Sequence, residues 1–275
     1  MRNSCRRAIP IVLALVGLFS LPPLASGQGV SPQAAGDSLP SCGRADSSNA
    51  GRTCRLAVVP SRRAAEIHWY HAAAGLAAVA LTSLADESLR DQLQAHRSTG
   101  KDDVAGVFRR MGQPEVYGVV GLGTIAVGII GGNPRVRRAG ERISAGLLTA
   151  AFVSSVLKGV VGRQRPTASN DAYSFKPFSS QDSWPSGHTT VAFALAASVA
   201  DELHSTPVTV ALYSSAALTG WSRMNDNKHW LSDVVMGALV GVTSAKLMNG
   251  RWRVLGLHAP KFLLEPGAAG VSLRF

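Results

Sequence analysis

A histidine and a carboxylate in the second half of the chain have the spacing of a nucleophile and its orienting group. His229 and Asp233 are four residues apart, so on one helix they lie on the same face within reach of each other. A carboxylate that accepts the Nδ1–H of an imidazole fixes its tautomer and leaves the Nε2 lone pair free to attack. A surface contact is the alternative reading of such a pair. The preceding Ser222-Arg223 favours function, because a short loop can bring Arg223 to face His229.

The tetrapeptide Pro185-Ser186-Gly187-His188 precedes an apolar run that is typical of a helix. Pro and Ser are frequent at helix starts, and Gly lets a ligand approach the backbone closely. Free amides and the positive end of the helix dipole favour an anion at this position. His188 is then placed to donate a proton to the departing oxygen of a bound phosphate. An ordinary helix cap with an exposed histidine is the alternative.

Two cations precede this tetrapeptide. Lys158 and Arg165 are seven residues apart, close to two helical turns, so both can reach one ligand from a helix end. Basic residues in a last turn also simply complement the helix dipole. However, Lys158 ends the uncharged run 143–157, and a buried cation there requires an anion. Arg163 lies in the same segment but ranks below Arg165, because Pro166 anchors the latter.

These segments together place three cations, two histidines and one carboxylate within residues 158–233. Such groups can grip a phosphate dianion, attack its phosphorus and protonate the leaving group. No separate Cys/His grouping of metal-ligand type is present in the sequence. We therefore expect a phosphorylated substrate and no cofactor.

The composition limits the class of protein. Hydrophobic residues make up 46% of the 275 residues and charged residues only 16%, against about 25% in an average soluble protein. This shortage of charge favours a deeply buried helical core or contact with a membrane. The formal net charge of +11 suits anionic substrates or an anionic membrane surface. Nucleic acid is not an expected partner, because no Lys/Arg run is interleaved with aromatic residues.

The first 27 residues have the features of a secretory signal. Three arginines and no acid lie in the first seven residues, residues 9–21 are apolar, and small residues occupy positions 25–27. We expect a signal peptide over residues 1–27 and export to the cell envelope; an uncleaved anchor helix is the alternative.

Residues 28–63 are rich in Gly, Ser, Pro and Asn, which is typical of a weakly structured, low-complexity arm. Cys5 would leave with the signal peptide, so Cys42 and Cys54 remain as an even pair in an oxidising compartment. We expect a disulfide between them, with two free surface cysteines as the alternative.

Long segments rich in Ala, Val, Leu and Gly follow, without the alternation of strands. Six of them predict helices: Ile67–Ala85, Val116–Gly132, Ile143–Val161, Gly187–Leu203, Pro207–Met224 and His229–Met248. The expected fold is all-α, a six-helix bundle within residues 64–250. In the tail, residues 251–275, the alternation in the final residues predicts a short strand, as an edge or hairpin packed on the bundle.

Whether the bundle spans a membrane is a separate question. Ile67–Ala85 has no formal charge over nineteen residues and is long enough to span, whereas most other segments are shorter or interrupted by site residues. If all six span and the chain start is exported, the arginine-rich loop 133–142 lies outside, against the positive-inside tendency. We therefore expect first an exported, membrane-associated domain, and second a six-span protein.

The three motif segments resemble the type 2 phosphatidic acid phosphatase and vanadium haloperoxidase superfamily. Its signature is Lys-x6-Arg-Pro, then Pro-Ser-Gly-His, then Ser-Arg-x5-His-x3-Asp. The chain fits every fixed position and both internal spacings. The motifs cover residues 158–233, and the family's helical core plausibly covers 64–248.

The resemblance implies a role for each matching residue. His229 would form a phosphohistidine, oriented by Asp233, and His188 would act as general acid and then activate water. The phosphoryl oxygens would be bound by the remaining motif residues: Lys158, Arg165, Arg223, Ser186 and the Gly187 amide. The expected activity is that of a metal-independent phosphatase acting on phosphomonoesters or pyrophosphates, with lipid phosphates preferred. The alternatives are an exported acid phosphatase for soluble phosphates, a vanadate-dependent haloperoxidase, and a phosphate-binding envelope protein with an idle site.

Overall fold

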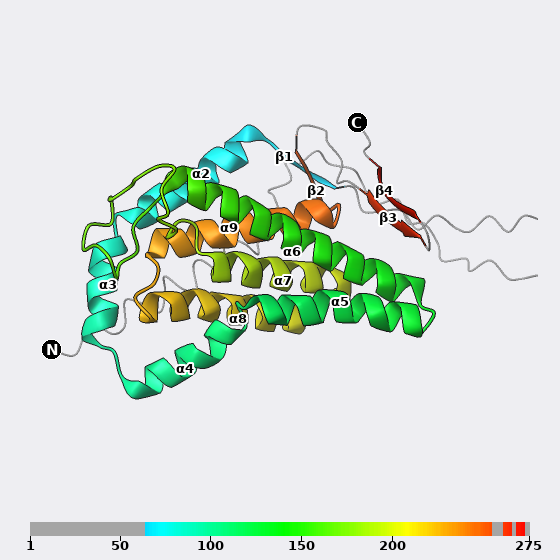
Figure 1. Cartoon of the computed structure of the whole chain (residues 1–275), viewed down its shortest axis with the longest axis horizontal. Coiled ribbons are helices and arrows are strands. Elements are labelled where there is room, and N and C mark those ends of the chain that lie inside the picture. Colours follow the sequence, from blue (N-terminus) through cyan, green and yellow to red (C-terminus); the bar gives the residue numbers. More distant parts are fainter. Residues whose placement is uncertain (1–63, 255–260, 266–267, 273–275) are drawn as a thin grey trace, which may run out of the picture. The chain divides into compact units, whose positions relative to one another are not determined.

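The computed structural model describes residues 64–254, 261–265 and 268–272 (Figure 1). The expected signal peptide 1–27, the arm 28–63 and the Cys42–Cys54 pair lie outside these residues, so they stay predictions.

All six predicted segments are helical, which confirms the all-α class. They form α2 (Trp69–Ser83), α5 (Pro114–Ile130), α6 (Pro134–Val161), α7 (Gly187–Leu203), α8 (Thr206–Asn225) and α9 (Leu231–Met248). For α7 the predicted and observed bounds agree, because Ser186 stops helical geometry at one end and His204 adopts a left-handed conformation at the other.

The start of α6 differs most from its prediction. The helix begins at Pro134 rather than at Ile143, because Asn133 caps it. The side-chain oxygen of Asn133 accepts hydrogen bonds from the amides of Arg135 at 3.0 Å and Val136 at 3.3 Å, and a proline suits the first helical position. The apolar pattern did not predict residues 134–142 as helix, because this stretch is rich in arginine.

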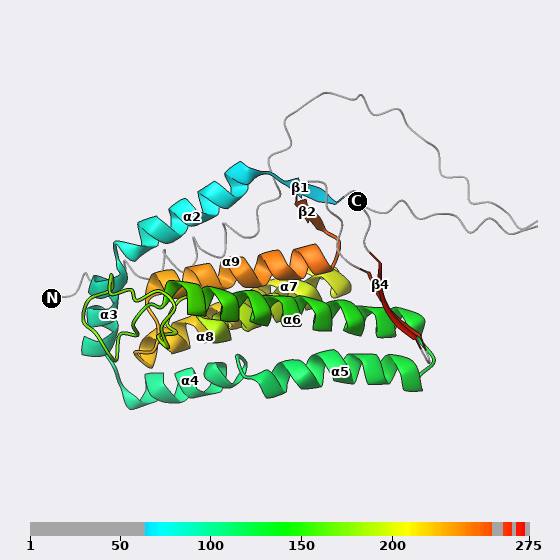
Figure 2. The ribbon, with the colours of Figure 1, turned by 45° about the horizontal axis from the view of Figure 1, so that its top comes forward.

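Two helices were not predicted at all: α3 (Asp86–Ala95) and α4 (Thr99–Arg110). Both are rich in charged and polar residues, so they lack the long apolar runs on which the prediction relied. They join α2 to α5 at one end of the bundle (Figures 1 and 2). The Ser98 side chain caps α4 by accepting from the Lys101 amide at 3.4 Å.

Four short strands complete the described residues. β1 (Ala65–Ile67) pairs in parallel with β2 (Trp252–Val254), and β3 (Lys261–Glu265) pairs antiparallel with β4 (Ala268–Ser272). The strand expected in the tail is therefore present as β4, within a hairpin.

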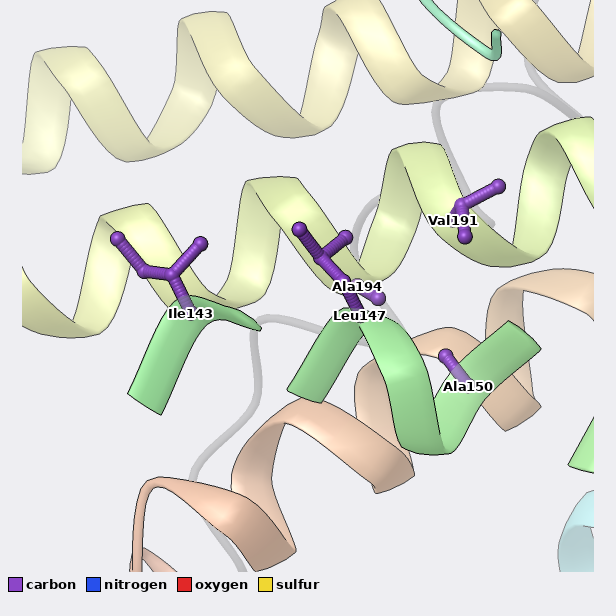
Figure 3. Packing of buried hydrophobic residues seen from close by; sticks show 5 residues of the cluster. All are labelled: Ile143, Leu147, Ala150, Val191 and Ala194. Atoms are coloured by element: carbon purple, nitrogen blue, oxygen red, sulfur yellow. The ribbon is translucent and has the colours of Figure 1, made fainter. Parts of the chain in front are cut away.

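The core is built around α7, which packs against α6, α8 and α9 (Figures 1 and 2). Figure 3 shows one buried cluster of this core, formed where three residues of α6 meet two of α7. Its members are Ile143, Leu147, Ala150, Val191 and Ala194.

Glycines let α9 approach α7 closely. A Cβ on Gly237 would lie 2.7 Å from the carbonyl oxygen of Ser186, and one on Gly241 only 2.1 Å from that of Thr190. No other residue permits these separations. The contact matters for the site, because it presses the first turn of α7 against the second and third turns of α9.

Several stretches have the length and composition of membrane spans. Within the part of the chain that the structure describes, three qualify: Thr99–Ile130, Pro134–Val161 and Leu231–Met248, with a fourth if the bent pair α2 and α3 counts as one. The expectation that residues 67–85 are long enough to span is not met by α2 alone, which reaches the required length only together with α3. On α5, Leu122 and Ile130 are 66% and 87% exposed, which indicates an apolar surface outside the bundle.

Candidate active site

The three motifs meet at one end of the bundle. α6 and α8 end there, and α7 and α9 begin there (Figures 1 and 2). The amide of Ser186 donates to the carbonyl oxygen of Asp233 at 3.0 Å, which joins the second motif to the third. A Cβ on Gly187 would lie 3.6 Å from Cε of Lys158, which joins the first motif to the second. Segments far apart in the sequence therefore share one site.

His229 and Asp233 form a buried pair, but not on one helix as predicted: α9 begins at Leu231, and His229 precedes its N-cap residue Trp230. Nδ1 of His229 lies 3.4 Å from Oδ2 of Asp233, and the two residues are 4% and 0% exposed. The contact is long for a hydrogen bond, and such contacts tighten when substrate binds. The pair is arranged as an imidazole held by a carboxylate, with Nε2 as the free nitrogen.

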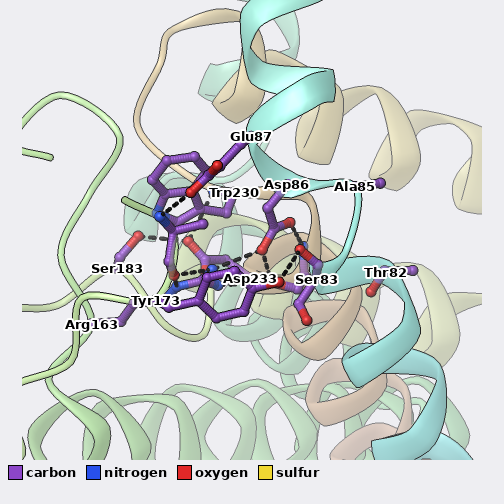
Figure 4. Close-up of polar contacts among 12 residues, drawn as sticks. Thr82, Ser83, Ala85, Asp86, Glu87, Arg163, Tyr173, Ser183, Trp230 and Asp233 are labelled. Carbon is purple, nitrogen blue, oxygen red and sulfur yellow. Dashed lines mark hydrogen bonds and ion pairs between the residues drawn. The ribbon is translucent and has the colours of Figure 1, made fainter. Parts of the chain in front are cut away.

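Asp233 accepts three further hydrogen bonds, which fix its orientation (Figure 4). Its Oδ2 accepts from the Trp230 amide at 2.9 Å and from the Ser183 hydroxyl at 2.6 Å. Its Oδ1 accepts from Nη1 of Arg163 at 2.6 Å. The Trp230 contact follows from local sequence, because Trp230 is the N-cap residue of α9 and Asp233 is the third residue of the helix. Ser183 was not among the predicted site residues, because no motif marks it.

Arg163 is buried next to Asp233. Only 2% of it is exposed, and it pairs with Asp86 as well as with Asp233. Its low rank as a phosphate ligand agrees with this position. Asp86 was not predicted either, although it directly follows the nineteen uncharged residues 67–85. In the structure it is buried.

Arg165 and Lys158 both contact Asp182. Arg165 donates from Nε to Oδ1 at 2.8 Å and from Nη2 to Oδ2 at 2.6 Å, and Nζ of Lys158 donates to the carbonyl oxygen of Asp182. Partial burial disfavours the charged carboxylate, but the hydrogen bond and charge of Arg165, with that of Lys158, hold the pKa of Asp182 below its usual value. Asp182 was not among the predicted site residues either.

Arg223 supplies the third cation. It is 6% exposed, and its Nη1 donates to Oδ2 of Asp226 at 3.0 Å. Its buried Nε has no hydrogen-bond partner among the residues that the structure describes. A buried guanidinium with a spare donor is well suited to an anionic ligand.

His188 stands among these cations. Its side chain lies against Gly112, where a Cβ would be 2.7 Å from the Cβ of His188. Burial and then the positive charges of nearby groups, Arg223 foremost, lower the pKa of His188 to about 4. Burial also lowers the pKa of His229, and the hydrogen bond and charge of Asp233 oppose that shift. Both imidazoles are therefore neutral at pH 7 before an anion binds.

Ser186 is fully buried at the N-cap of α7. Its hydroxyl accepts a hydrogen bond from the Thr189 hydroxyl at 2.9 Å, and its amide donates one to the carbonyl oxygen of Asp233. Ser186 can thus offer its hydroxyl proton to a phosphate, but not its amide. The amide of Gly187, one residue further, has no partner within the helix because it belongs to the first turn.

A cavity of about 470 Å³ extends from this site between α5, α6 and α7. Lys158, Gly187 and His188 line it together with apolar residues such as Leu122 and Leu147. Charged groups and proton donors therefore adjoin a largely apolar cavity.

No group of three or more His, Cys, Asp or Glu side chains with the arrangement of a metal site occurs within residues 64–254. The requirement for a metal is thus a question for experiment.

Comparison with known proteins agrees with the motifs. Residues 142–253 match the family model of the PAP2 superfamily. The chain is 45% identical over 73 residues to "Lipid A 1-phosphatase" of Porphyromonas gingivalis, covering 26% of this chain and 16% of that protein. It is 31% identical over 117 residues to "Putative undecaprenyl-diphosphatase YbjG" of Escherichia coli, covering 42% of this chain and 58% of that protein. The alignments thus cover less than two thirds of either relative.

A solved structure shares the fold. The transmembrane PAP2-type phosphatidylglycerolphosphate phosphatase of Bacillus subtilis aligns with a TM-score of 0.50 and 20% identity, over 66% of this chain and 95% of that one. The helical bundle predicted from the sequence is confirmed by this likeness.

Proposed function

We propose that this chain, which belongs to the PAP2 superfamily, is a membrane-associated phosphatase that hydrolyses lipid phosphates through a phosphohistidine at His229. The observation that carries the proposal is the cavity that leads from Lys158, Gly187 and His188 into apolar surroundings. The names of the two relatives, a lipid A phosphatase and an undecaprenyl-diphosphatase, support the same substrate class.

Phosphate binding comes first. The phosphoryl oxygens are gripped by Lys158, Arg165 and Arg223, with the Ser186 hydroxyl and the Gly187 amide as further donors. Lys158 and Arg165 exchange their bonds to Asp182 for bonds to phosphate, and the spare Nε of Arg223 gains an acceptor. Fixed cations and amides stabilise the charge that the transition state spreads over these oxygens.

Chemistry then proceeds in two displacements. Nε2 of His229 attacks phosphorus as the bond to the leaving oxygen breaks, and protonated His188 gives its proton to that oxygen. Asp233 stabilises the positive charge that develops on the His229 ring. In the second step neutral His188 takes a proton from water, the water oxygen attacks phosphorus, and the P–N bond to His229 breaks. Free phosphate leaves, and both histidines return to their starting state.

The organic part of the substrate is argued from the cavity. Its volume of about 470 Å³ is that of a ligand pocket, and Leu122, Leu147, Leu148 and Val191 give it apolar walls. A hydrocarbon chain attached to the phosphate gains free energy by lying there. The exposed apolar face of α5 would let the rest of the lipid remain in the bilayer.

We further propose that the chain is exported and lies in the cell-envelope membrane. The apolar stretches in α5, α6 and α9 support membrane association. Protease accessibility in intact cells tests the arrangement: protection of residues 86–114 together with cleavage within 133–142 supports spanning helices, and uniform cleavage supports a peripheral domain.

The decisive assay compares substrates in the presence of EDTA. We expect hydrolysis of detergent-dispersed phosphatidate or a prenyl pyrophosphate without divalent metal, and inhibition by vanadate, which mimics five-coordinate phosphorus. Ready hydrolysis of nucleotides or sugar phosphates, but not of lipids, would instead identify a soluble-substrate acid phosphatase. Ala151→Phe, which narrows the cavity, should lower kcat/KM for the lipid and spare a small aryl phosphate.

A further inference from the structure

Three buried charged residues form a linked cluster that ends at Asp233, the partner of the proposed nucleophile His229. Asp86 comes from the first turn of α3, Arg163 from the segment after α6, and Asp233 from the first turn of α9. Nη2 of Arg163 lies 2.7 Å from Oδ2 of Asp86, and Nη1 lies 2.6 Å from Oδ1 of Asp233 (Figure 4). The exposed fractions of the side chains are 2% or less.

We propose that Asp86 and Arg163 are positioning residues, which keep Asp233 aimed at His229 and keep it effectively negative. The proposal rests on the proposed role of His229 as nucleophile. Neither residue is in the motifs' fixed positions, and neither contacts the cations that would hold phosphate.

Arg163 fixes the geometry of Asp233. A guanidinium is planar and presents its donors in a rigid fork, so it can hold two carboxylates at a set angle. The fork is itself held, because the carbonyl oxygen of Ala172 accepts from its Nε at 2.9 Å and from its Nη2 at 2.6 Å. The amide of Ala172 in turn donates to Glu87, next to Asp86 on α3. The carboxylate that faces His229 therefore cannot turn without breaking this network.

Asp86 also fixes the start of α9. Its Oδ1 accepts from the Ser232 amide at 2.8 Å, and its Oδ2 accepts from the Ser232 hydroxyl at 2.6 Å. The same hydroxyl accepts from Nη1 of Arg163 at 2.7 Å. A carboxylate suits this position, because the first amides of a helix lack partners and form the positive end of its dipole. Asp233 is the next residue, so Asp86 helps to place it through Ser232.

The charges explain why two carboxylates share one arginine. If Asp233 alone were paired with Arg163, the two charges would cancel. The pair could then stabilise a positive charge on His229 only weakly. Asp86 draws on the same guanidinium, so the cluster of two carboxylates and one guanidinium keeps a formal charge of −1. Buried charges are costly unless each is paired, and this arrangement pairs all three while leaving a net negative charge beside the imidazole.

Other charged groups also face His229 and must be counted. Asp233 acts from α9, Lys158 from α6, Arg165 and Asp182 from the segment between α6 and α7, and His188 from α7. All of these stay unchanged when Asp86 alone is altered, so a change in the basicity of His229 can be assigned to the cluster.

The test compares Asp86→Asn with Asp201→Asn in the full chain. Asp201 is a matched control: it is a half-buried carboxylate that accepts from Lys246 at 2.5 Å and Asn249 at 3.2 Å, and it lies about 20 Å along α7 from the site. We expect Asp86→Asn to lower kcat by about 10- to 100-fold, as losses of orienting partners commonly do, with KM within about twofold of the wild-type value. Asp201→Asn should leave kcat and KM unchanged.

The pH profile separates positioning from simple loss of structure. Removing negative charge makes His229 a weaker base, so the acidic limb of kcat/KM should move to lower pH in Asp86→Asn and stay in place in Asp201→Asn. Wild-type kcat and an unmoved limb in Asp86→Asn would overturn the inference, as would a rise in KM alone. If Asp86→Asn does not fold, Ser232→Ala, which removes one bond to each partner and no charge, should lower kcat in the same direction by a smaller factor; an unchanged kcat would overturn the inference.

A readout without turnover keeps this inference distinct from the proposed function. In ¹⁵N-labelled protein, the imidazole resonances of His229, assigned through His229→Gln, should titrate at lower pH in Asp86→Asn than in wild type. If the wild-type protein hydrolyses no phosphate ester or pyrophosphate, the proposed function is wrong. The titration would still test whether the cluster raises the basicity of His229. Identical titrations in the two proteins would overturn the inference whatever the activity.

Discussion

Arg165 and Asp182 form a bidentate ion pair at the mouth of the site, with donor–acceptor distances of 2.8 and 2.6 Å. The carboxylate thus occupies the donors that the proposed mechanism assigns to phosphate. Because Asp182 is half exposed, the pair is weak enough for a substrate dianion to displace it.

This relationship predicts the effect of Asp182→Asn. Removing the competing charge should tighten vanadate binding by up to about fivefold, the range expected for one exposed ion pair. The inhibition constant for vanadate measures this directly. Weaker inhibition would mean that Asp182 mainly holds Arg165 in position.

His229→Ala should abolish turnover. A nucleophile has no substitute in this site, so the loss should be on the order of 10⁴-fold or more. Rapid quenching at alkaline pH should trap labelled phosphate on wild-type protein and none on the variant. Retained labelling of His229→Ala would place the phosphoryl acceptor elsewhere.

His188→Ala should affect substrates unequally. General acids contribute about 10²–10⁴-fold, and less when the leaving group needs no proton. Alkyl phosphates should therefore lose far more activity than aryl phosphates with acidic leaving groups. Equal losses on both substrates would argue against the acid role.

The pH profile of the wild-type protein should change on substrate binding. In the empty site, burial and the surrounding cations hold the pKa of His188 at about 4. A bound dianion offsets those positive charges and favours the protonated ring, so its pKa rises. Since kcat/KM reports the free protein and kcat the complex, the basic limb of kcat should lie at higher pH. Coincident limbs would show that phosphate does not reach His188.

Gly241→Ala should damage stability and activity together. The added Cβ would lie 2.1 Å from the carbonyl oxygen of Thr190, so α9 must move away from α7, at a cost of about 1–3 kcal/mol. The displacement also separates Asp233 from Ser186. Gly159→Ala is the control, since a Cβ there meets nothing within 4 Å; it should leave both quantities intact. Thermal unfolding and kcat measure them, and normal values for Gly241→Ala would refute the packing argument.

The sequence by itself predicted six of the helices and the motif residues of the proposed site. Apolar runs far longer than strands require helices, as for α7, and the motif spacing marks His229 and Asp233 as partners. The pair meets across the start of α9, because His229 precedes the N-cap residue Trp230. These are local properties, set within a few turns of chain. The helices α3 and α4 were not predicted, because charged amphipathic segments contain no long apolar runs.

Only the tertiary structure decided which groups support those residues. Arg163 and Ser183 contact Asp233 from 70 and 50 positions away in the chain. Asp86 is linked to Asp233 through Arg163, and the residue types alone do not reveal these contacts. The same holds for Asp182 against Arg165 and for the apolar cavity between α5, α6 and α7. Such contacts depend on how closely helices pack, as Gly241 against Thr190 illustrates. Packing is a property of the whole fold, because it is set by the shapes of all facing side chains at once.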